Sequence, residues 1–325
     1  MAATCLLAAC TSEAREDEQT AGSLPTTLSD GGGLGTSSDS GGGIGTSSGG
    51  SGSDEETTAN ETIGTPGSTG GLLLDVGSVP TTTADPDSVG PETCEEDIDV
   101  VFVMDVSTTM GAFLGTLADQ MLVVDEAIAA LNLPTPPQYG LVVFVDDFAL
   151  LGKGQAYADA AALQADFQEW GTFTASNSQV SGEGSNSTWP ENSLDALHAA
   201  ATAYDWRPAD TTSRIIIHTT DDTFSEAPDV VNGVTILNDY PQTVQALQDQ
   251  QIRVFSFTAE IGGSCNCEDV APGWSAPYDG QPAIPEATDG ARFDIDQVLA
   301  GTLDLSEAIN AAIKGAVCDP YEPVG

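Results

Sequence analysis

Hydrophobic residues are distributed unevenly along this chain of 325 residues. Before residue 94, hardly any apolar run exceeds four residues, and glycine, serine and threonine dominate. Such a segment cannot bury enough apolar surface to offset the entropy lost on ordering, so we expect residues 11–93 to be a disordered linker. Residues 94–318 remain for one α/β domain with a sizeable core, followed by a short tail at 319–325.

From residue 97 onward, two kinds of hydrophobic pattern alternate. Continuous apolar runs, which are typical of strands buried on both faces, occur at 98–104, 139–145, 214–218, 253–257 and 291–295. Segments with apolar residues three or four positions apart, which are typical of helices, occur at 111–131, 160–170, 193–204, 240–250 and 305–317. This alternation predicts a parallel sheet covered by helices on both faces, with its binding site at the carboxyl ends of the strands.

A short polar motif, Asp105-Val106-Ser107-Thr108-Thr109, directly follows the first apolar run. Its odd positions place one carboxylate and two hydroxyl groups on the same side of a tight loop. These are hard oxygen ligands of the kind that Mg²⁺ and Ca²⁺ prefer, and hydroxyl groups leave the ion electrophilic toward an anion. The same residue types are also favoured at ordinary helix starts, so the motif alone leaves both interpretations open.

The context of this motif resembles the von Willebrand factor A family. DIDVVFVMDVSTTM is similar to the opening of that family, whose DxSxS loop forms the metal-ion-dependent adhesion site. RIIIHTTDD is similar to its fourth strand and maps the terminal site carboxylate onto Asp221. NSTWPENSLDAL is similar to a segment of integrin β subunits and makes Glu191 the loop ligand, with Thr188 as the alternative because integrin α subunits use a threonine. ATDGARFDI and the helix after it resemble the last strand and closing helix.

The resemblance spans residues 94–318 and implies both a fold and a site. The fold is a three-layer, doubly wound, mainly parallel six-stranded sheet flanked by helices. The site holds Mg²⁺, with Mn²⁺ and Ca²⁺ as alternatives, and the ion captures an Asp or Glu carboxylate of a partner protein. The residues implied are Asp105, Ser107, Thr109, Glu191 and Asp221, of which the two aspartates act largely through waters.

Three departures from the family pattern bear on the site, and the last two of them predict a single ion. Thr109 replaces the usual second serine, which keeps the hydroxyl but tightens the fit. Gly111 and Ala112 stand where integrin β subunits carry paired aspartates of an adjacent calcium site. Thr188 stands where they have an aspartate of a further calcium site.

The charge balance restricts the possible partners. Fifty acidic residues against seven basic ones give a net charge of −43, which repels phosphate backbones and makes nucleic acid an unsuitable partner. The sequence contains no P-loop, and the polar loop with Ser185 and Ser187 lacks a G-x-S-x-G motif. We therefore favour a binding module, treated as a monomer, over an enzyme. A metal-dependent hydrolase with Glu191 as base, and a structural envelope protein with a vestigial site, remain open alternatives.

The first ten residues, MAATCLLAAC, resemble a bacterial lipobox in which Cys10 is lipidated. This resemblance implies a lipid-anchored protein of the cell envelope, either an outer-membrane lipoprotein or one at the cell surface or in the periplasm. No basic residue precedes Arg15, so either the true start lies upstream or the segment is not a signal.

Four cysteines are candidates for disulfide bonds. Extracellular members of the family bridge the two ends of the domain, which implies a Cys94–Cys318 disulfide. Cys265 and Cys267 lack a second cysteine pair or a nearby histidine for zinc, so a small-loop disulfide and two free thiols are the alternatives there.

Overall fold

The computed structural model describes residues 96–324, apart from 183, 260–268 and 318. The predictions for the segments 1–10 and 11–93, for lipidation of Cys10, and for the Cys94–Cys318 and Cys265–Cys267 disulfides lie outside the described residues. The domain boundaries therefore stay predictions.

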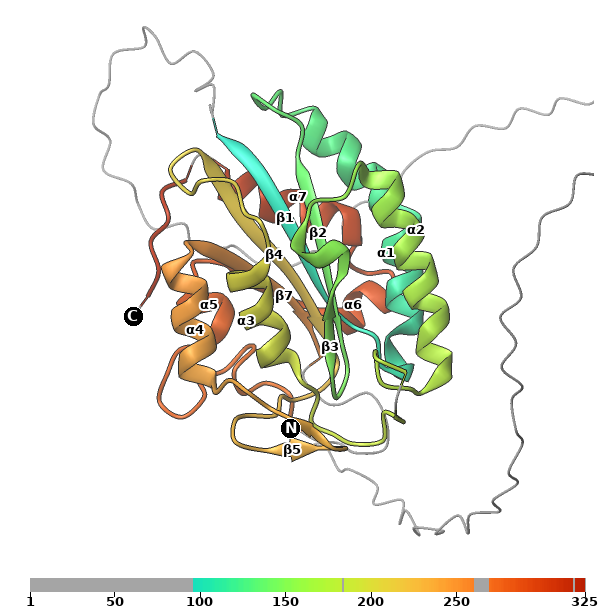
Figure 1. The fold of residues 1–325 in the computed structure, drawn as a ribbon. Coiled ribbons are helices and arrows are strands. Elements are labelled where there is room, and N and C mark those ends of the chain that lie inside the picture. Colours follow the sequence, from blue (N-terminus) through green and yellow to red (C-terminus); the bar gives the residue numbers. More distant parts are fainter. Residues whose placement is uncertain (1–95, 183, 260–268, 318, 325) are drawn as a thin grey trace, which may run out of the picture. The chain divides into compact units, whose positions relative to one another are not determined.

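A six-stranded sheet forms the centre of the described region (Figure 1). Its strands lie in the order β3-β2-β1-β4-β7-β8, and only the edge strand β3 runs antiparallel to its neighbour. The predicted fold class, a three-layer and mainly parallel six-stranded sheet, is confirmed. The strands are β1 (Asp97–Asp105), β2 (Gln138–Phe144), β3 (Phe148–Leu150), β4 (Thr212–Thr220), β7 (Ile252–Thr258) and β8 (Ala291–Asp294).

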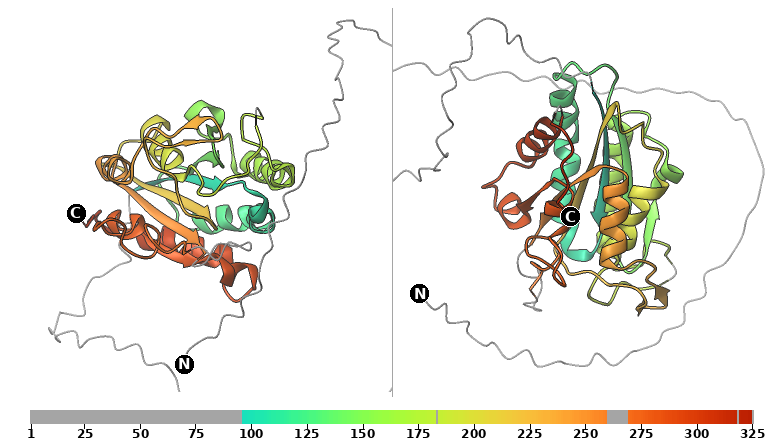
Figure 2. Two further views of the ribbon diagram at one scale, coloured as in Figure 1. Left: turned by 90° about the horizontal axis from the view of Figure 1, so that it is seen from below. Right: turned by 90° about the vertical axis from the view of Figure 1, so that its left-hand side faces the viewer.

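Helices cover both faces of the sheet (Figure 2). One face packs against α1 (Gly111–Ala129), α2 (Ala160–Phe173), α6 (Ile295–Leu299) and α7 (Leu305–Ala316). The other packs against α3 (Ser193–Ala203), α4 (Tyr240–Asp249) and α5 (Ile284–Ala287). None of the helices in the described part of the chain is long and apolar enough to cross a membrane.

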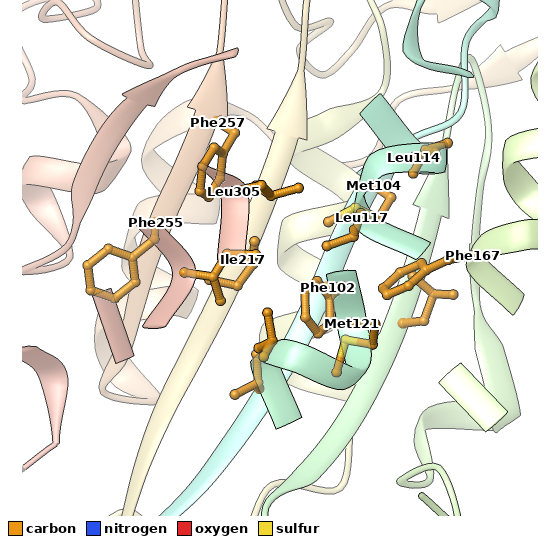
Figure 3. Close-up of a cluster of buried hydrophobic side chains, with 14 of the residues drawn as sticks. Phe102, Met104, Leu114, Leu117, Met121, Phe167, Ile217, Phe255, Phe257 and Leu305 are labelled. Atoms are coloured by element: carbon orange, nitrogen blue, oxygen red, sulfur yellow. The ribbon is translucent and has the colours of Figure 1, made fainter. Parts of the chain in front are cut away.

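The alternation of side chains along β1 explains why the sheet needs two helical layers. Phe102 and Met104 point into the first core, drawn in Figure 3, whereas Val101 and Val103 point into the second. In the first core, the rings of Phe102 and Phe167 meet edge to face at 5.1 Å between centroids. A strand buried on both faces therefore appears in the sequence as a continuous apolar run.

Several short elements were not predicted from the sequence. β3 has only three residues, all partly buried, so it leaves no clear periodic pattern. The hairpin of β5 (Val230–Val231) and β6 (Val234–Thr235) is shorter still. Its turn is Asn232-Gly233, both with positive φ, and Asn-Gly is the favoured pair for such a turn. That dipeptide was a usable sequence signal for the hairpin.

The strand order reverses direction at β1. The chain moves from β1 to β2 and β3 on one side, and then returns to β4, β7 and β8 on the other. Ligands of open α/β sheets bind at the carboxyl ends of strands at such a reversal. Asp105 ends β1 and Asp221 directly follows β4, the neighbouring strand, so both predicted carboxylates lie at this position.

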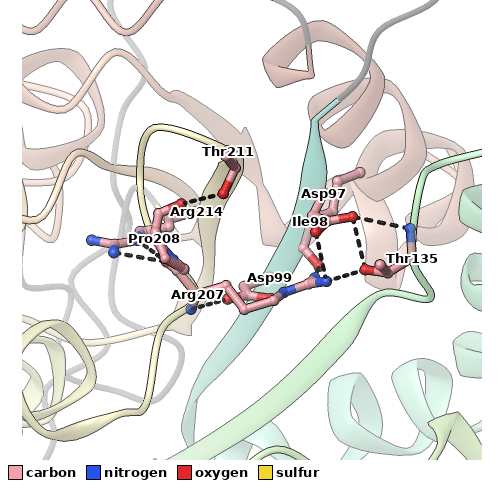
Figure 4. Close-up of polar contacts among 8 residues, drawn as sticks. All are labelled: Asp97, Ile98, Asp99, Thr135, Arg207, Pro208, Thr211 and Arg214. Carbon is pink, nitrogen blue, oxygen red and sulfur yellow. Dashed lines mark hydrogen bonds and ion pairs between the residues drawn. The ribbon is translucent and has the colours of Figure 1, made fainter.

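Arg207 binds the start of the central strand β1, at the end of the sheet opposite to Asp105 (Figure 4). Its backbone N–H and Nε donate to the two carboxylate oxygens of Asp99, at 2.8 and 2.7 Å, and Asp99 is fully buried. The guanidinium also donates to the carbonyl of Ile98 and the hydroxyl of Thr135. Burial raises the pKa of Asp99, and Arg207 opposes that shift.

We expect Arg207→Lys to lower the free energy of unfolding by about 1–2 kcal/mol. Lysine keeps the charge but cannot reproduce the fork that bonds Asp99, Thr135 and the Ile98 carbonyl together, and each such bond is worth about 1 kcal/mol. Urea denaturation of the full chain measures the change. Wild-type stability in the variant would show that the guanidinium contacts of Arg207 do not stabilise the start of β1.

Candidate metal site

Asp105 is held by two neighbours at the end of β1. Its Oδ1 accepts a hydrogen bond from the Ser107 backbone N–H at 2.7 Å, and its Oδ2 accepts one from the Thr220 hydroxyl at 2.7 Å. The side chain is fully buried. The carboxylate is therefore fixed in position between β1 and β4.

The two predicted hydroxyl ligands lie side by side. Ser107 Oγ is 3.2 Å from Thr109 Oγ1, and Thr109 Oγ1 donates to Asp221 Oδ1 at 2.9 Å. A continuous chain of hydrogen bonds thus joins Asp105, Ser107, Thr109 and Asp221. Ser107 is nearly buried, whereas Thr109 is exposed, so the site opens to solvent on the Thr109 side.

Glu191 reaches the same place from the loop before α3. Its backbone N–H donates to Thr223 O at 3.1 Å, and its carbonyl accepts from the Ser225 N–H at 2.8 Å. The Glu191 loop is therefore fastened to the segment that follows Asp221. The carboxylate of Glu191 is almost fully buried, and the negative charge of Asp105 acts on it by raising its pKa.

Thr188, the alternative to Glu191, has a different contact. Its hydroxyl donates to Asp146 Oδ1 at the end of β2, and the Asn232 amide approaches the same hydroxyl at 3.3 Å. The Thr188 hydroxyl therefore contacts Asp146, whereas the Glu191 carboxylate is influenced by the charge of Asp105.

Burial is the main reason why the ionised forms of the three site carboxylates are disfavoured, and the negative charges of Asp221 and Asp105 add to it for Asp105 and Glu191. Burial, reinforced by the negative charge of Asp221, raises the pKa of Asp105 to about 7. Burial and the charge of Asp105 raise the pKa of Glu191 well above its usual value. Burial also raises the pKa of Asp221, although the Thr109 hydrogen bond opposes the shift. Each carboxylate therefore lacks sufficient compensation for its charge.

Glu191 also has an unsatisfied atom. Its Oε1 accepts from the Asn186 amide at 3.2 Å, but its Oε2 is buried without a hydrogen-bond partner. In the described part of the chain, no ion pair neutralises Asp105, Glu191 or Asp221, and Arg207 and Arg253 pair with other aspartates. A buried, unpaired charge of this kind is costly.

These observations test whether the residues suit a divalent cation. Among the described residues, no group of three or more histidine, cysteine, aspartate or glutamate side chains could hold a metal by itself. The donor set here is mixed instead, because two neutral hydroxyls lie among carboxylates. Hard oxygen donors, an excess of buried negative charge and an unpartnered carboxylate oxygen all fit Mg²⁺, Mn²⁺ or Ca²⁺.

Three supporting residues were not identified from the sequence. Thr220 orients Asp105, Asn186 orients Glu191, and the fully buried Asp146 accepts from Thr188 and Asn232. Asp146 could have been found, because it follows a buried strand as Asp105 and Asp221 do. Asn186 has no comparable signal, since its role depends on how a long polar loop folds back.

Comparison with known proteins leaves the family open. No family model matches the sequence, and no curated protein matches it. The solved structures that are similar include an aerotolerance-related membrane protein from Bacteroides fragilis NCTC 9343, at 14% identity over 67% of this chain and 99% of that one, with a TM-score of 0.38.

Another similar structure is proximal thread matrix protein 1 from the mussel byssus, described with a zinc-occupied MIDAS motif. It is 15% identical over 70% of this chain, with a TM-score of 0.39. A second structure of the mussel protein gives 14% identity over 71% of this chain and a TM-score of 0.40. The chain matches 48% of the mussel protein's length.

Proposed function

We propose that the domain is a binding module that captures a carboxylate of a partner protein through one divalent cation, with Mg²⁺ as the first candidate and Mn²⁺ or Ca²⁺ as alternatives. The observation that carries the proposal is that the buried Asp105 and Glu191 and the half-buried Asp221 all have raised pKa values. Asp105 and Asp221 are joined through the hydroxyls of Ser107 and Thr109, and no ion pair in the described part of the chain compensates the three carboxylates. When bound, the cation supplies positive charge and a coordination position for an incoming carboxylate.

Each residue has a distinct role in this proposal. Ser107 and Thr109 offer their hydroxyl oxygens directly and add no charge, so the cation keeps its attraction for an anion. Asp105 and Asp221 lie behind them and act largely through waters. Glu191 contributes its unpartnered Oε2 from the loop before α3. The exposed side of Thr109 leaves the approach for the partner open.

The geometry favours binding over hydrolysis. A general base must come within hydrogen-bond reach of the proton that it removes, either directly or through a water. Glu191 is the candidate base, but its side chain is almost fully buried and its backbone is fastened to the neighbouring loop on both sides. A buried and fixed carboxylate suits a metal ligand better than a general base, which must reach the substrate.

The setting of the module is part of the same proposal. Lipidation of Cys10 anchors the chain to the cell envelope, and residues 11–93 act as a flexible tether. A Gly/Ser-rich tether of about 80 residues spans on the order of 50 Å. The domain would then meet its partner away from the membrane surface.

The proposal predicts that Thr109→Ala weakens cation binding about tenfold, because it removes a donor oxygen and releases Asp221 from its hydrogen bond. Isothermal titration of the full chain with Mg²⁺ and with Mn²⁺ in 0.15 M NaCl measures the affinity. The salt screens non-specific attraction of cations to a chain with a net charge of −43.

Thr108→Ala is the matched control, since Thr108 is the exposed neighbour on the same turn and takes no part in the hydrogen bonds that join Asp105, Ser107, Thr109 and Asp221. It should bind as the wild type does. Equal affinities for both variants and the wild type would remove Thr109 from the site. Capture of envelope proteins that requires Mg²⁺ and is lost in EDTA tests the partner side of the proposal.

A further inference from the structure

A tryptophan outside the candidate site braces the segment that carries Asp221. Trp274 lies in the long connection between β7 and α5, and its side chain is fully buried. Its indole Nε1 donates to the backbone carbonyl of Asp222 at 3.3 Å. This contact is on the residue next to the proposed site carboxylate.

Trp274 also contacts residues on both sides of Asp221. Its ring lies 4.4 Å from that of His218, three residues earlier in β4, and 5.4 Å from that of Phe224, three residues later. Phe224 meets the indole edge to face at 83°. The indole therefore holds the chain before, at and after the turn that presents Asp221.

The brace is itself anchored in the core. His218 is fully buried, stacks on Phe144 of β2 at 5.9 Å, and places its Nδ1 3.2 Å from the Ser256 hydroxyl. Burial lowers the pKa of His218 to about 3, so the imidazole is neutral and adds no charge beneath the site. On the other side, Phe224 packs against Tyr240 and Tyr278, at 5.5 and 4.8 Å.

The same brace extends to Glu191. The backbone groups of Glu191 bond to Thr223 and Ser225, the two neighbours of Phe224. Any shift of Phe224 would therefore move the Asp221 turn and the Glu191 loop together. Trp274 has no acidic or hydroxyl group that could bind a cation, so any effect of Trp274 on the site must be indirect.

We propose that Trp274 is a positioning residue that sets the cation affinity of the site by fixing the Asp221 turn and, through Phe224, the Glu191 loop. This inference rests on the proposed cation-binding function. Residues that orient metal ligands without touching the metal typically change affinity by about 10–100-fold when altered.

The test is the Mg²⁺ and Mn²⁺ affinity of the full chain carrying Trp274→Phe, measured by isothermal titration in 0.15 M NaCl. The phenyl ring keeps much of the packing but loses the bond to the Asp222 carbonyl, so we expect affinity to fall about tenfold. Trp206→Phe is the matched control, because Trp206 Nε1 donates to the Ala200 carbonyl at 2.9 Å and its ring packs on Tyr204. It should keep wild-type affinity.

Urea denaturation in EDTA accompanies each titration, so that a loss of fold is not mistaken for a loss of positioning. Phe224→Leu is a second variant, which keeps Trp274 but removes the ring that links it to the Glu191 loop, and it should also bind more weakly.

Wild-type affinity in either folded variant overturns the role of Trp274. If the wild-type chain binds neither cation, the proposed function and this inference both fail, whereas normal wild-type binding with unaffected variants overturns this inference alone.

Discussion

Asp105→Asn is expected to weaken Mg²⁺ binding at least 100-fold while making the cation-free protein more stable. The amide keeps an oxygen that can accept from the Ser107 N–H, and the Thr220 hydroxyl can rotate to accept from the new NH₂ group. The loop should therefore keep its shape. What disappears is a buried negative charge that the described residues leave without an ion pair.

The two effects have opposite signs for the same physical reason. A divalent cation compensates the charge of Asp105, so binding weakens when the charge is removed. Without a cation the charge is only a cost, so we expect Asp105→Asn to raise the free energy of unfolding by about 2 kcal/mol at pH 8 in EDTA. Titration calorimetry and urea denaturation measure the two quantities.

Asp99→Asn is a matched control at the other end of β1. Asp99 is equally buried, but it is paired with Arg207 through two hydrogen bonds. Removing its charge should lower stability and leave Mg²⁺ affinity unchanged. If Asp105→Asn behaved as Asp99→Asn does, Asp105 would be a structural carboxylate rather than part of a cation site.

The second large effect is expected in the pH dependence of stability. In the folded chain the pKa of Asp105 is raised to about 7, against 3.8 for the carboxyl in its ordinary environment. The folded state therefore keeps a proton that the unfolded state loses first. The stability contributed by this proton is complete below pH 3.8 and is lost as the pH rises through 7.

The difference between the two pKa values corresponds to about 4 kcal/mol, and the raised pKa values of Glu191 and Asp221 act in the same direction. In EDTA, we thus expect the free energy of unfolding to fall by several kcal/mol between pH 5 and pH 8. Saturating Mg²⁺ should remove most of this fall, because the cation binds the ionised form. A Mg²⁺ concentration of 100 times Kd raises the free energy of unfolding by about 2.7 kcal/mol.

Urea denaturation at a series of pH values, with NaCl at matched ionic strength in place of Mg²⁺ as the control, gives both curves. Asp105→Asn should flatten the curve measured in EDTA. A wild-type curve that is flat in EDTA, or that Mg²⁺ and Na⁺ change equally, would contradict the electrostatic account of the site.

The sheet could be predicted because its physical cause is local in the sequence. β1 and β4 are buried on both faces, so each appears as an unbroken apolar run that ends at a polar residue. Parallel strands bring such ends to one edge, so the apolar runs predict that Asp105 and Asp221 both lie at that edge, and the family resemblance places them in one site. The edge strand β3 was missed because three partly buried residues carry no period.

The surroundings of the site could not be predicted in the same way. Asn186 and Thr188 belong to a polar loop whose path is set by contacts with Asp146 and the β5–β6 hairpin. Trp274 lies 53 residues after Asp221 in the sequence, within a connection that has no periodic pattern. Its bond to Asp222 forms only once the segment has packed against the end of β4.

The most direct measurement for the central claim is a crystal of the full chain or its domain soaked in Mn²⁺, examined by anomalous scattering. We predict one strong anomalous peak within coordination distance of Ser107 Oγ and Thr109 Oγ1, with Asp105, Asp221 and Glu191 around it. A crystal whose only peaks lie on scattered surface carboxylates, with none at the two hydroxyls, would contradict the cation site and the carboxylate-binding function built on it.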